Sequence, residues 1–389
     1  MGANPYLGYL RELKAHYDYP ILNAEFGLPT SWGNARYSPC GMNHGGLTEE
    51  EQGKYIMRMF NNMYDSNYCG AVMFSWVDEW FKQTWITRPF SSDRQRMWHN
   101  ICSPENNYGL IQFVPDPDFY EKNRKTLNFD LENITRAAVW HDFAWFNVEI
   151  KLKSPLKSGD TLWIAYDTYR RDLGESTLPN HKKALDNRAE FLVRITSDSA
   201  ILFVTKAYNM QGLLYQNCSS PAFKTKKTDG EPWIPYKWQI DETHLKPNIQ
   251  DIGNMQICKG DAKLSQHHAV QLRSDGSIFI RIPWTLLHFS DPSSFMVIDD
   301  DSSPAFCKKN WCGGIFLNSI PSDEGIAVTI VYDNEIAKNE PYKWKNWNVR
   351  GQEVLNPNMF VEEEKASLEV IRNGLKNTSF KPKLKNLQK

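Results

Sequence analysis

The sequence predicts a chain of two parts, an α/β part followed by an all-β part that ends in a helix. Through the first 113 residues, helix-like and strand-like stretches alternate. Between about residues 126 and 345, strand-like runs follow one another at short intervals, with Gly, Asp, Asn, Ser and Pro in the turns. At 389 residues the chain is long enough for two domains.

The α/β part begins with an amphipathic helix, because Leu7, Leu10 and Leu13 share one face of "NPYLGYLRELKAHY". The run "PILNAEFG" is a short strand, and "CGAVMFSW" is a second one. Between them, Thr48 and Glu51 form the capping box of a second helix. The second run is too continuously apolar for a half-exposed antiparallel strand, and we expect both strands to be buried on both faces, as in a parallel sheet.

The strand-like runs of the second part predict an antiparallel β-sandwich. The runs are "AAVWHDFAWFNVEIKL", "DTLWIAYDTY", "AEFLVRIT", "AILFVTKAY", "HHAVQLRSDGSIFIRIPW", "FMVID" and "GIAVTIVYD". Within the fifth run, "SDGS" is a hairpin signal. We therefore expect a barrel-like domain over residues 1–113, a linker over 114–125, the sandwich over 126–345, and a helix with a basic tail over 346–389.

The last of these segments, "NPNMFVEEEKASLEVIRNGLK", predicts a helix. Val361, Leu368, Ile371 and Leu375 fall on one face of it. Three glutamates lie in its first turns and basic residues lie near its end, which matches the helix dipole.

Charge and cysteine usage exclude several classes of protein. The chain has 45 basic and 46 acidic residues, so we expect no nucleic-acid partner. No apolar run approaches the ~18 residues of a membrane span, so we expect no membrane-spanning segment in this sequence. The seven cysteines contain no CxxC pair, which argues against a zinc site or a disulfide framework; Cys307 and Cys312 could bridge in an oxidising compartment, but free thiols are the expectation. Aromatic residues make up 13% of the chain, a surplus that fits sugar binding as well as core packing.

The candidate chemistry lies at the ends of the two predicted strands of the first part. In a parallel α/β barrel, the carboxyl ends of the strands carry the active site. Glu25 lies at the carboxyl end of the first strand, and Ser75, Trp76, Asp78 and Glu79 lie at the carboxyl end of the second. These carboxylates could act in catalysis, or they could be solvated or paired acids of a loop.

The stretches "ILNAEFG" and "GAVMFSWVDEW" resemble the seventh and eighth strands of clan A glycoside hydrolases. The longer run from Asn4 to Phe113 resembles a bacterial branch with glycoside hydrolase family 2-like barrels. The resemblance implies a partial (β/α)₈ barrel, namely its last two βα units. It also implies a retaining mechanism with Glu25 as the nucleophile.

The same resemblance supplies the substrate-binding candidates. It implies that Trp76 stacks under a sugar and that Asp78 and Glu79 hold hydroxyl groups or orient Glu25. The further candidates are Trp32, Arg36, His44 and Trp80. A structural acid that pairs with Arg36 or Arg58 remains the alternative for Glu25.

The resemblance leaves the catalytic machinery incomplete. Clan A enzymes carry the acid/base glutamate at the end of the fourth strand, and nothing upstream of Glu25 supplies it. We therefore expect this chain to be the C-terminal part of a larger enzyme that contributes roughly 200 further residues of barrel. The expected partners are a carbohydrate substrate and that missing barrel half. The chain alone is expected to be inactive and prone to associate, because two strands cannot close a barrel. The residues do not name a compartment; the parent enzyme is expected outside the cell or in the cell envelope.

The all-β part has a resemblance of its own. "DTLWIAYDTYRRDLGESTLP" followed by "AEFLVRI" resembles family nine carbohydrate-binding modules and the related DOMON sandwiches. It implies that Asp167, Asp172 and Glu190 hold a structural calcium ion or form a polar network. It also implies sugar stacking on one or more tryptophans among Trp233, Trp238, Trp284 and Trp311, although core packing is the alternative for each. No other cofactor is expected.

Three functions remain open at this point. The first is the C-terminal portion of a retaining glycoside hydrolase. The second is a non-catalytic carbohydrate-binding or scaffold protein that keeps a barrel remnant for packing. The third is an antiparallel β domain that serves interactions without any sugar.

Overall fold

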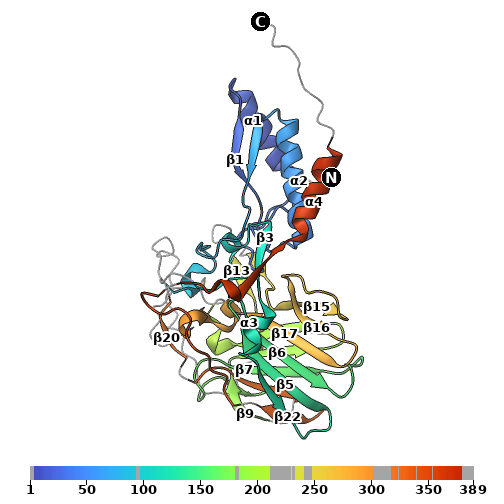
Figure 1. Cartoon of the computed structure of the whole chain (residues 1–389), viewed down its shortest axis with the longest axis vertical. Helices are drawn as coiled ribbons and strands as arrows, with labels where there is room; N and C mark the ends of the chain where they lie inside the picture. The colour runs from blue at the N-terminus through green and yellow to red at the C-terminus, as the bar shows by residue number, and fades with distance from the viewer. Residues whose placement is uncertain are drawn as a thin grey trace.

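The computed structural model describes residues 4–92, 97–179, 184–210, 229, 233–240, 248–300, 317–322, 324–338, 340–352 and 354–378. The fold is mixed α/β, with many strands and few helices (Figure 1). The α-helices of the described residues are α1 (Pro5–His16), α2 (Glu49–Asp65), α3 (Pro117–Glu121) and α4 (Ala366–Asn377).

The strands of the first and last parts of the chain are β1 (Leu22–Phe26), β2 (Gly70–Met73), β3 (Ile111–Pro115) and β23 (Phe360–Glu364). The strands between them are β4 (Lys125–Asn128), β5 (Ile134–His141), β6 (Trp145–Leu152), β7 (Leu162–Asp167), β8 (Glu175–Thr177), β9 (Ala184–Ala189), β10 (Phe191–Ile195), β11 (Ala200–Thr205), β12 (Trp233–Pro235), β13 (Trp238–Ile240), β14 (Asn248–Gln250), β15 (Asn254–Lys259), β16 (His268–Leu272), β17 (Ser277–Pro283), β18 (Phe289–Asp291), β19 (Met296–Ile298), β20 (Ser319–Pro321), β21 (Ala327–Tyr332) and β22 (Glu335–Lys338). All of the predicted strand-like runs contain observed strands.

The first elements form a βαβ unit. Strands β1 and β2 are parallel neighbours, and α2 connects them. The predicted capping box at the start of α2 is confirmed: the Glu51 backbone N–H donates to the Thr48 hydroxyl at 3.2 Å, and the Glu51 carboxylate accepts from the Thr48 backbone N–H at 2.9 Å. Phe26 of β1 and Ile56 and Met63 of α2 share a small hydrophobic core, which holds the strands against the helix.

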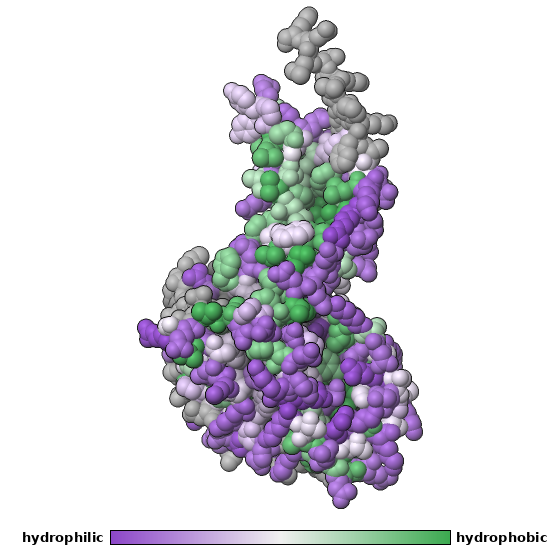
Figure 2. Space-filling view, in the orientation of Figure 1, coloured by the Kyte–Doolittle hydropathy of each residue, from purple (hydrophilic) through white to green (hydrophobic). Residues whose placement is uncertain are grey.

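The other face of this parallel pair is open, so the prediction that both strands are buried on both faces is wrong. Leu22 is 57% exposed and Val72 is 52% exposed. Figure 2 shows hydrophobic residues gathered over this upper unit, whereas the visible face of the lower unit is mostly hydrophilic. Within the described residues, β1 and β2 pair only with each other. Short parallel strands normally lie in a larger sheet covered on both sides, so this arrangement leaves apolar surface in contact with solvent.

The C-terminal segment returns to this first unit. Residues 360–364 form β23, which pairs antiparallel with β3, so the prediction that they begin a helix is wrong. The helix α4 starts only at Ala366, and its Leu368 and Ile371 join the core that contains Ile56. The approach of α4 to α2 is close, because a Cβ atom on Gly53 would lie 2.7 Å from the Cβ atom of Val370.

Most of the remaining strands form one curled sheet of twelve strands in the order β22-β21-β7-β10-β11-β15-β16-β17-β6-β5-β4, with β12 paired to β11. Among the described strands of this sheet, the pair β15–β16 is parallel and the other pairs are antiparallel. Side chains alternate along β6, so Phe146, Val148 and Ile150 point inward, where they share one hydrophobic core with residues of β7 and β10 from the other half of the sheet. The predicted hairpin turn is present between β16 and β17, with Gly276 at a φ of +84°.

Loops from the first part of the chain pack into the core of this sheet. Trp32 lies 5.5 Å from Trp145 between ring centroids, and Trp80 lies 4.5 Å from Phe143. The two parts of the chain therefore share a continuous hydrophobic junction.

No helix in the described part of the chain is long and apolar enough to cross a membrane. Cys40, Cys69, Cys102 and Cys258 are free thiols. The expectation for Cys307 and Cys312 lies outside the described residues.

Candidate functional site

Glu25 lies at the carboxyl end of β1 and is exposed to solvent. The pairing of β1 with β2 shifts register between Asn23 and Phe26, which puts two β1 residues opposite one β2 residue. Asn23 faces the helices, where its side-chain amide donates to the Tyr6 hydroxyl at 3.2 Å. The local geometry thus separates a structural side chain, Asn23, from an accessible carboxylate, Glu25.

Glu25 lines a groove of about 460 Å³ that runs along β1 and α1. The residues that line it include Glu25, Phe74, Lys82, Glu105 and Tyr108. This volume lies within the range of small-ligand sites. The groove brings a carboxylate from β1 together with charged groups from the loops that follow β2.

Ion pairs hold the charged side chains around Glu25 in place. The Lys82 ammonium lies 2.8 Å from a Glu79 oxygen and 4.0 Å from the centre of the Phe74 ring. His44 Nε2 lies 3.1 Å from Glu105 Oε1. The hydrogen bond from His44 lowers the pKa of Glu105, so Glu105 is ionised at neutral pH. Two of the predicted residues, His44 and Glu79, therefore reach the neighbourhood of Glu25 through Glu105 and Lys82, neither of which was predicted as a site residue.

Several aromatic rings pack together near Glu105 and Lys82. The Phe74 and Tyr108 rings lie 5.2 Å apart, and His44 lies 5.2 Å from Trp85. The peptide bond between Phe74 and Ser75 is cis. Trp76, which follows it, is 60% exposed. Trp76 is therefore open to solvent, and its stacking on a sugar stays a prediction.

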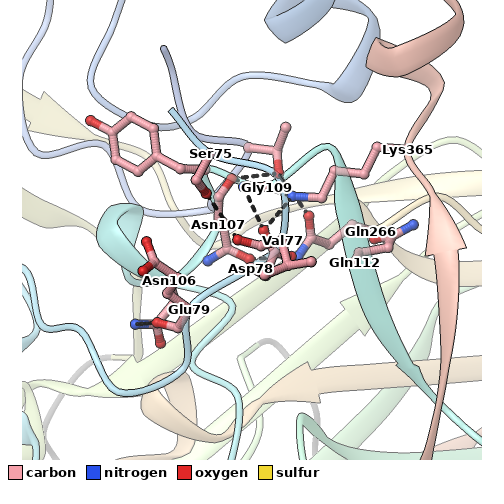
Figure 3. A network of polar contacts seen from close by, with 12 residues as sticks. Ser75, Val77, Asp78, Glu79, Asn106, Asn107, Gly109, Gln112, Gln266 and Lys365 are labelled. Carbon is pink, nitrogen blue, oxygen red and sulfur yellow. Dashed lines mark hydrogen bonds and ion pairs between the residues drawn. The ribbon is translucent and has the colours of Figure 1, made fainter. Parts of the chain in front are cut away.

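Asp78 lies in the interior, where it forms an ion pair with Lys365 (Figure 3). The Lys365 ammonium donates to Asp78 Oδ1 at 2.8 Å, to the Thr30 hydroxyl at 3.0 Å and to the Asn107 carbonyl at 3.3 Å. The Gly109 backbone N–H also donates to Asp78 Oδ1, at 2.9 Å. Burial raises the pKa of Asp78 to about 6, although Lys365 opposes this shift. Asp78 is therefore held inside the protein, away from the surface on which Glu25 lies.

The network around Asp78 continues into the curled sheet. The Thr30 hydroxyl donates to Gln266 Oε1 at 2.9 Å, and the Gln266 amide donates to Asn107 Oδ1 at 2.7 Å (Figure 3). Gln266 precedes β16, and Lys365 precedes α4. Five segments that are separate in sequence, around residues 30, 78, 107–109, 266 and 365, thus meet at one buried polar cluster.

The remaining candidates of the first part divide between the interior and the surface. Trp32 is buried, and its indole N–H donates to the Gln266 carbonyl at 3.0 Å. Trp80 is buried and stacks on His99 at 5.4 Å between ring centroids. Arg36 lies exposed on the loop that follows β1. The structure therefore uses Trp32 and Trp80 to hold the two parts of the chain together.

The acids predicted for calcium do not form one cluster. Glu190 is buried and its carboxylate accepts from the backbone N–H groups of Thr168 and Tyr169, at 2.9 and 3.3 Å. Asp167 is also buried, and burial raises the pKa of Asp167 to about 7 and that of Glu190 well above its usual range. Asp172 is exposed. No group of three or more His, Cys, Asp and Glu residues suited to a metal ion occurs in the described ranges.

Two of the tryptophans expected to stack on sugars are core residues, namely Trp238 and Trp284. Trp233 is half-buried and its indole N–H donates to the Thr177 carbonyl at 2.8 Å. Trp311 lies outside the described residues.

Comparison with known proteins gives no match: no family model, no curated protein and no solved structure is significantly similar to this chain.

Proposed function

We propose that this chain forms the C-terminal portion of a retaining glycoside hydrolase and carries its nucleophile, Glu25. The observation that supports the proposal best is the placement of Glu25 and Trp76 at the same ends of two parallel strands. Glu25 is exposed, and it lines a groove that also holds Lys82 and Glu105. An accessible carboxylate can attack a sugar ring, and an exposed indole at the same end of the sheet can pack on one.

In this proposal, β1 and β2 are the last two strands of a (β/α)₈ barrel. The open face that carries Leu22 and Val72 is then the surface on which the other strands pack. A partner that supplies those strands would cover apolar area that now lies in water. The substrate is a glycan, bound across the carboxyl ends of the strands.

The mechanism needs a second carboxyl group as the acid, ~5 to 5.5 Å from the nucleophile. Glu105 does not fit this role, because His44 holds it in the ionised form that cannot donate a proton. The Lys82 ammonium and the Glu105–His44 pair instead supply fixed charges near the nucleophile. The acid/base residue is expected from outside this chain.

An activated substrate tests the role of Glu25 without the missing acid. A dinitrophenyl fluoroglycoside has a leaving group that departs without protonation, so a nucleophile alone can form the covalent intermediate. We expect a panel of such compounds to label the intact chain once, with the mass increase on the peptide that contains Glu25. The Glu25→Gln variant should lose the label. The control Glu12→Gln, which changes an exposed residue of α1, should retain it. Labelling that survives in Glu25→Gln, or no labelling by any sugar of the panel, would refute the proposal. Multiple turnover by the chain alone would contradict the expectation that the acid/base is missing.

A second candidate is a non-catalytic carbohydrate-binding or scaffold protein. It is favoured by the burial of Asp78, Trp32 and Trp80, which removes three of the residues expected to touch a substrate. Glycan binding that is unchanged by Glu25→Gln, together with no covalent labelling, would select this second function.

A further inference from the structure

A second groove lies on the outer face of the curled sheet, far in sequence from Glu25. Its volume is about 820 Å³, which is within the range of ligand sites. Strands β5, β6, β16 and β17 contribute residues to it, and α3 and the ends of β3 and β23 contribute residues to its side. In Figure 1, α3 and the lower end of β3 lie beside β6 and β17.

The floor of this groove is set by strand register. Asn147 of β6 lies between Trp140 of β5 and Arg281 of β17. One row further along, Glu149 of β6 lies beside Phe279 of β17. Because the alternate residues of β6 fill the core, these side chains point outward. The floor thus combines two half-buried aromatic rings, Trp140 and Phe279, with planar polar groups.

The aromatic rings are held in place by their neighbours. The ring centroids of Trp140 and Phe279 lie 5.5 Å apart, with an interplanar angle of 18°. The Arg124 guanidinium lies 4.5 Å from the centre of the Trp140 ring. This packing fixes the rings before any ligand arrives, so binding would cost little side-chain entropy.

Three arginines share the Glu149 carboxylate, and two of them, Arg124 and Arg273, line the groove together with it. Glu149 lies 2.6 Å from Arg124, 3.6 Å from Arg273 and 3.8 Å from Arg136. A guanidinium has five N–H donors, whereas a carboxylate has two oxygens. The cluster therefore orients the guanidinium groups and leaves N–H groups that can donate to a ligand.

Carboxylates dominate the rest of the lining. Of the residues that line the groove, four are Lys or Arg and seven are Asp or Glu. Lys263 and Glu363 form a pair at 2.7 Å on its side. Donors and acceptors thus alternate over the groove, with an excess of negative charge.

This lining excludes several ligand classes. A polyanion such as a nucleic acid is disfavoured by the seven acids. An apolar ligand would leave the charged groups without water. A peptide that adds as a strand needs a free sheet edge, whereas this floor is a sheet face whose backbone groups bond to neighbouring strands.

A neutral glycan matches what remains. Each hydroxyl group both donates and accepts, so it can pair with guanidinium and carboxylate groups in turn. The C–H faces of sugars pack on aromatic side chains such as Trp140 and Phe279. We propose that this groove is a binding site for a neutral glycan, separate from the groove of Glu25 and independent of catalysis there.

The test is affinity electrophoresis of the full chain through gels that contain neutral polysaccharides, with dextran sulfate as the polyanion probe. We expect at least one neutral polysaccharide to retard the chain and dextran sulfate to have no effect. The double variant Arg273→Gln/Phe279→Leu should weaken this binding by about tenfold or more, because it removes charge-assisted hydrogen bonds and an aromatic contact. Lys259→Gln is the matched control, since Lys259 lies on β15 and pairs with Asp198 at 2.8 Å outside the groove.

Two further measurements keep the result interpretable. The urea midpoints of the variants verify that each one is folded, and Arg273→Gln alone replaces the double variant if that protein is unstable. Glu25→Gln should bind as the unchanged chain does, which separates this proposal from the proposed catalysis. Retention of full affinity in the folded groove variants, binding to dextran sulfate alone, or no binding to any neutral polysaccharide would overturn the proposal.

Discussion

The buried pair of Asp78 and Lys365 gives the most stringent prediction. In Lys365→Met, the aliphatic part of the side chain remains and the ammonium is lost. Both side chains are fully buried, so the Asp78 carboxylate would keep only the Gly109 N–H as a donor to Oδ1. Removal of one partner from a buried ion pair typically costs about 3–5 kcal/mol, because it leaves an uncompensated charge. We expect a loss of that size in the free energy of unfolding at pH 8.

The pH dependence identifies the cause. The pKa of Asp78 is about 6 in the folded chain, above its ordinary value, so the stability of the unchanged protein falls between about pH 4 and pH 6 on account of this group and is then level. Without Lys365, the pKa of Asp78 in the folded chain rises further. The free energy of unfolding then continues to fall above pH 6. The difference between variant and unchanged protein should therefore grow above pH 6 by up to about 1.4 kcal/mol per pH unit.

The assay is urea unfolding followed by tryptophan fluorescence at pH 6 and pH 8. Lys54→Met is the matched control, because Lys54 and Glu50 form an exposed pair at 3.7 Å that contributes less than about 1 kcal/mol. In the double variant Lys365→Met/Asp78→Asn, the pH-dependent part of the loss in the free energy of unfolding should disappear. A loss below 1 kcal/mol at pH 8, or a loss equal at both pH values, would refute the assignment of a buried ion pair.

Three other substitutions test separate features. Gly53→Ala should destabilise the chain by about 1–3 kcal/mol, because its Cβ would meet Val370 at 2.7 Å and separate α2 from α4; Gly8→Ala, with nothing within 4 Å, should be neutral or slightly stabilising in the same urea assay. Asp167→Asn should gain stability relative to the unchanged protein as the pH rises from about 4 to about 7 in thermal unfolding, because Asp167 keeps its proton up to about pH 7 only when folded; a constant difference would contradict this. Leu22→Ser should reduce self-association in sedimentation velocity, since Leu22 is exposed on the open face of β1, and an unchanged chain that is wholly monomeric would show that this face is not adhesive.

Local features of the fold could be predicted from the sequence, because their causes lie within a few residues. The capping box of Thr48 and Glu51 is one example, and the turn at Gly276 is another. The strand-like runs bounded by turn residues likewise predicted β6 and β17. These signals depend on backbone geometry and not on the rest of the chain.

Features that depend on distant partners could not be predicted. The acidic run at residues 362–364 is typical of a helix start, but β3 offers it a strand partner about 250 residues earlier. Asp78 is a loop acid by its sequence, and only the approach of Lys365, 287 residues later, explains its burial. Neither residue carries a local signal of the other.

The candidate site shows the same division. The position of Glu25 at a strand end follows from the apolar run before it. The apolar run predicts Trp76 as the end of the second strand, whereas β2 ends at Met73 and Trp76 lies exposed beyond it. The burial of Trp80 against His99 and Phe143 follows from the docking of the curled sheet, which no local pattern encodes.

The return of α4 to α2 has a consequence for how the protein is made. During synthesis, the βαβ unit leaves the ribosome about 300 residues before the helix that completes its core. Contacts of such long sequence separation form slowly, and the partner surface stays uncovered meanwhile. The groove that holds Glu25 is therefore translated well before the helix that supports it, and a nascent chain that stalls before residue 366 would display the groove on an unfinished scaffold.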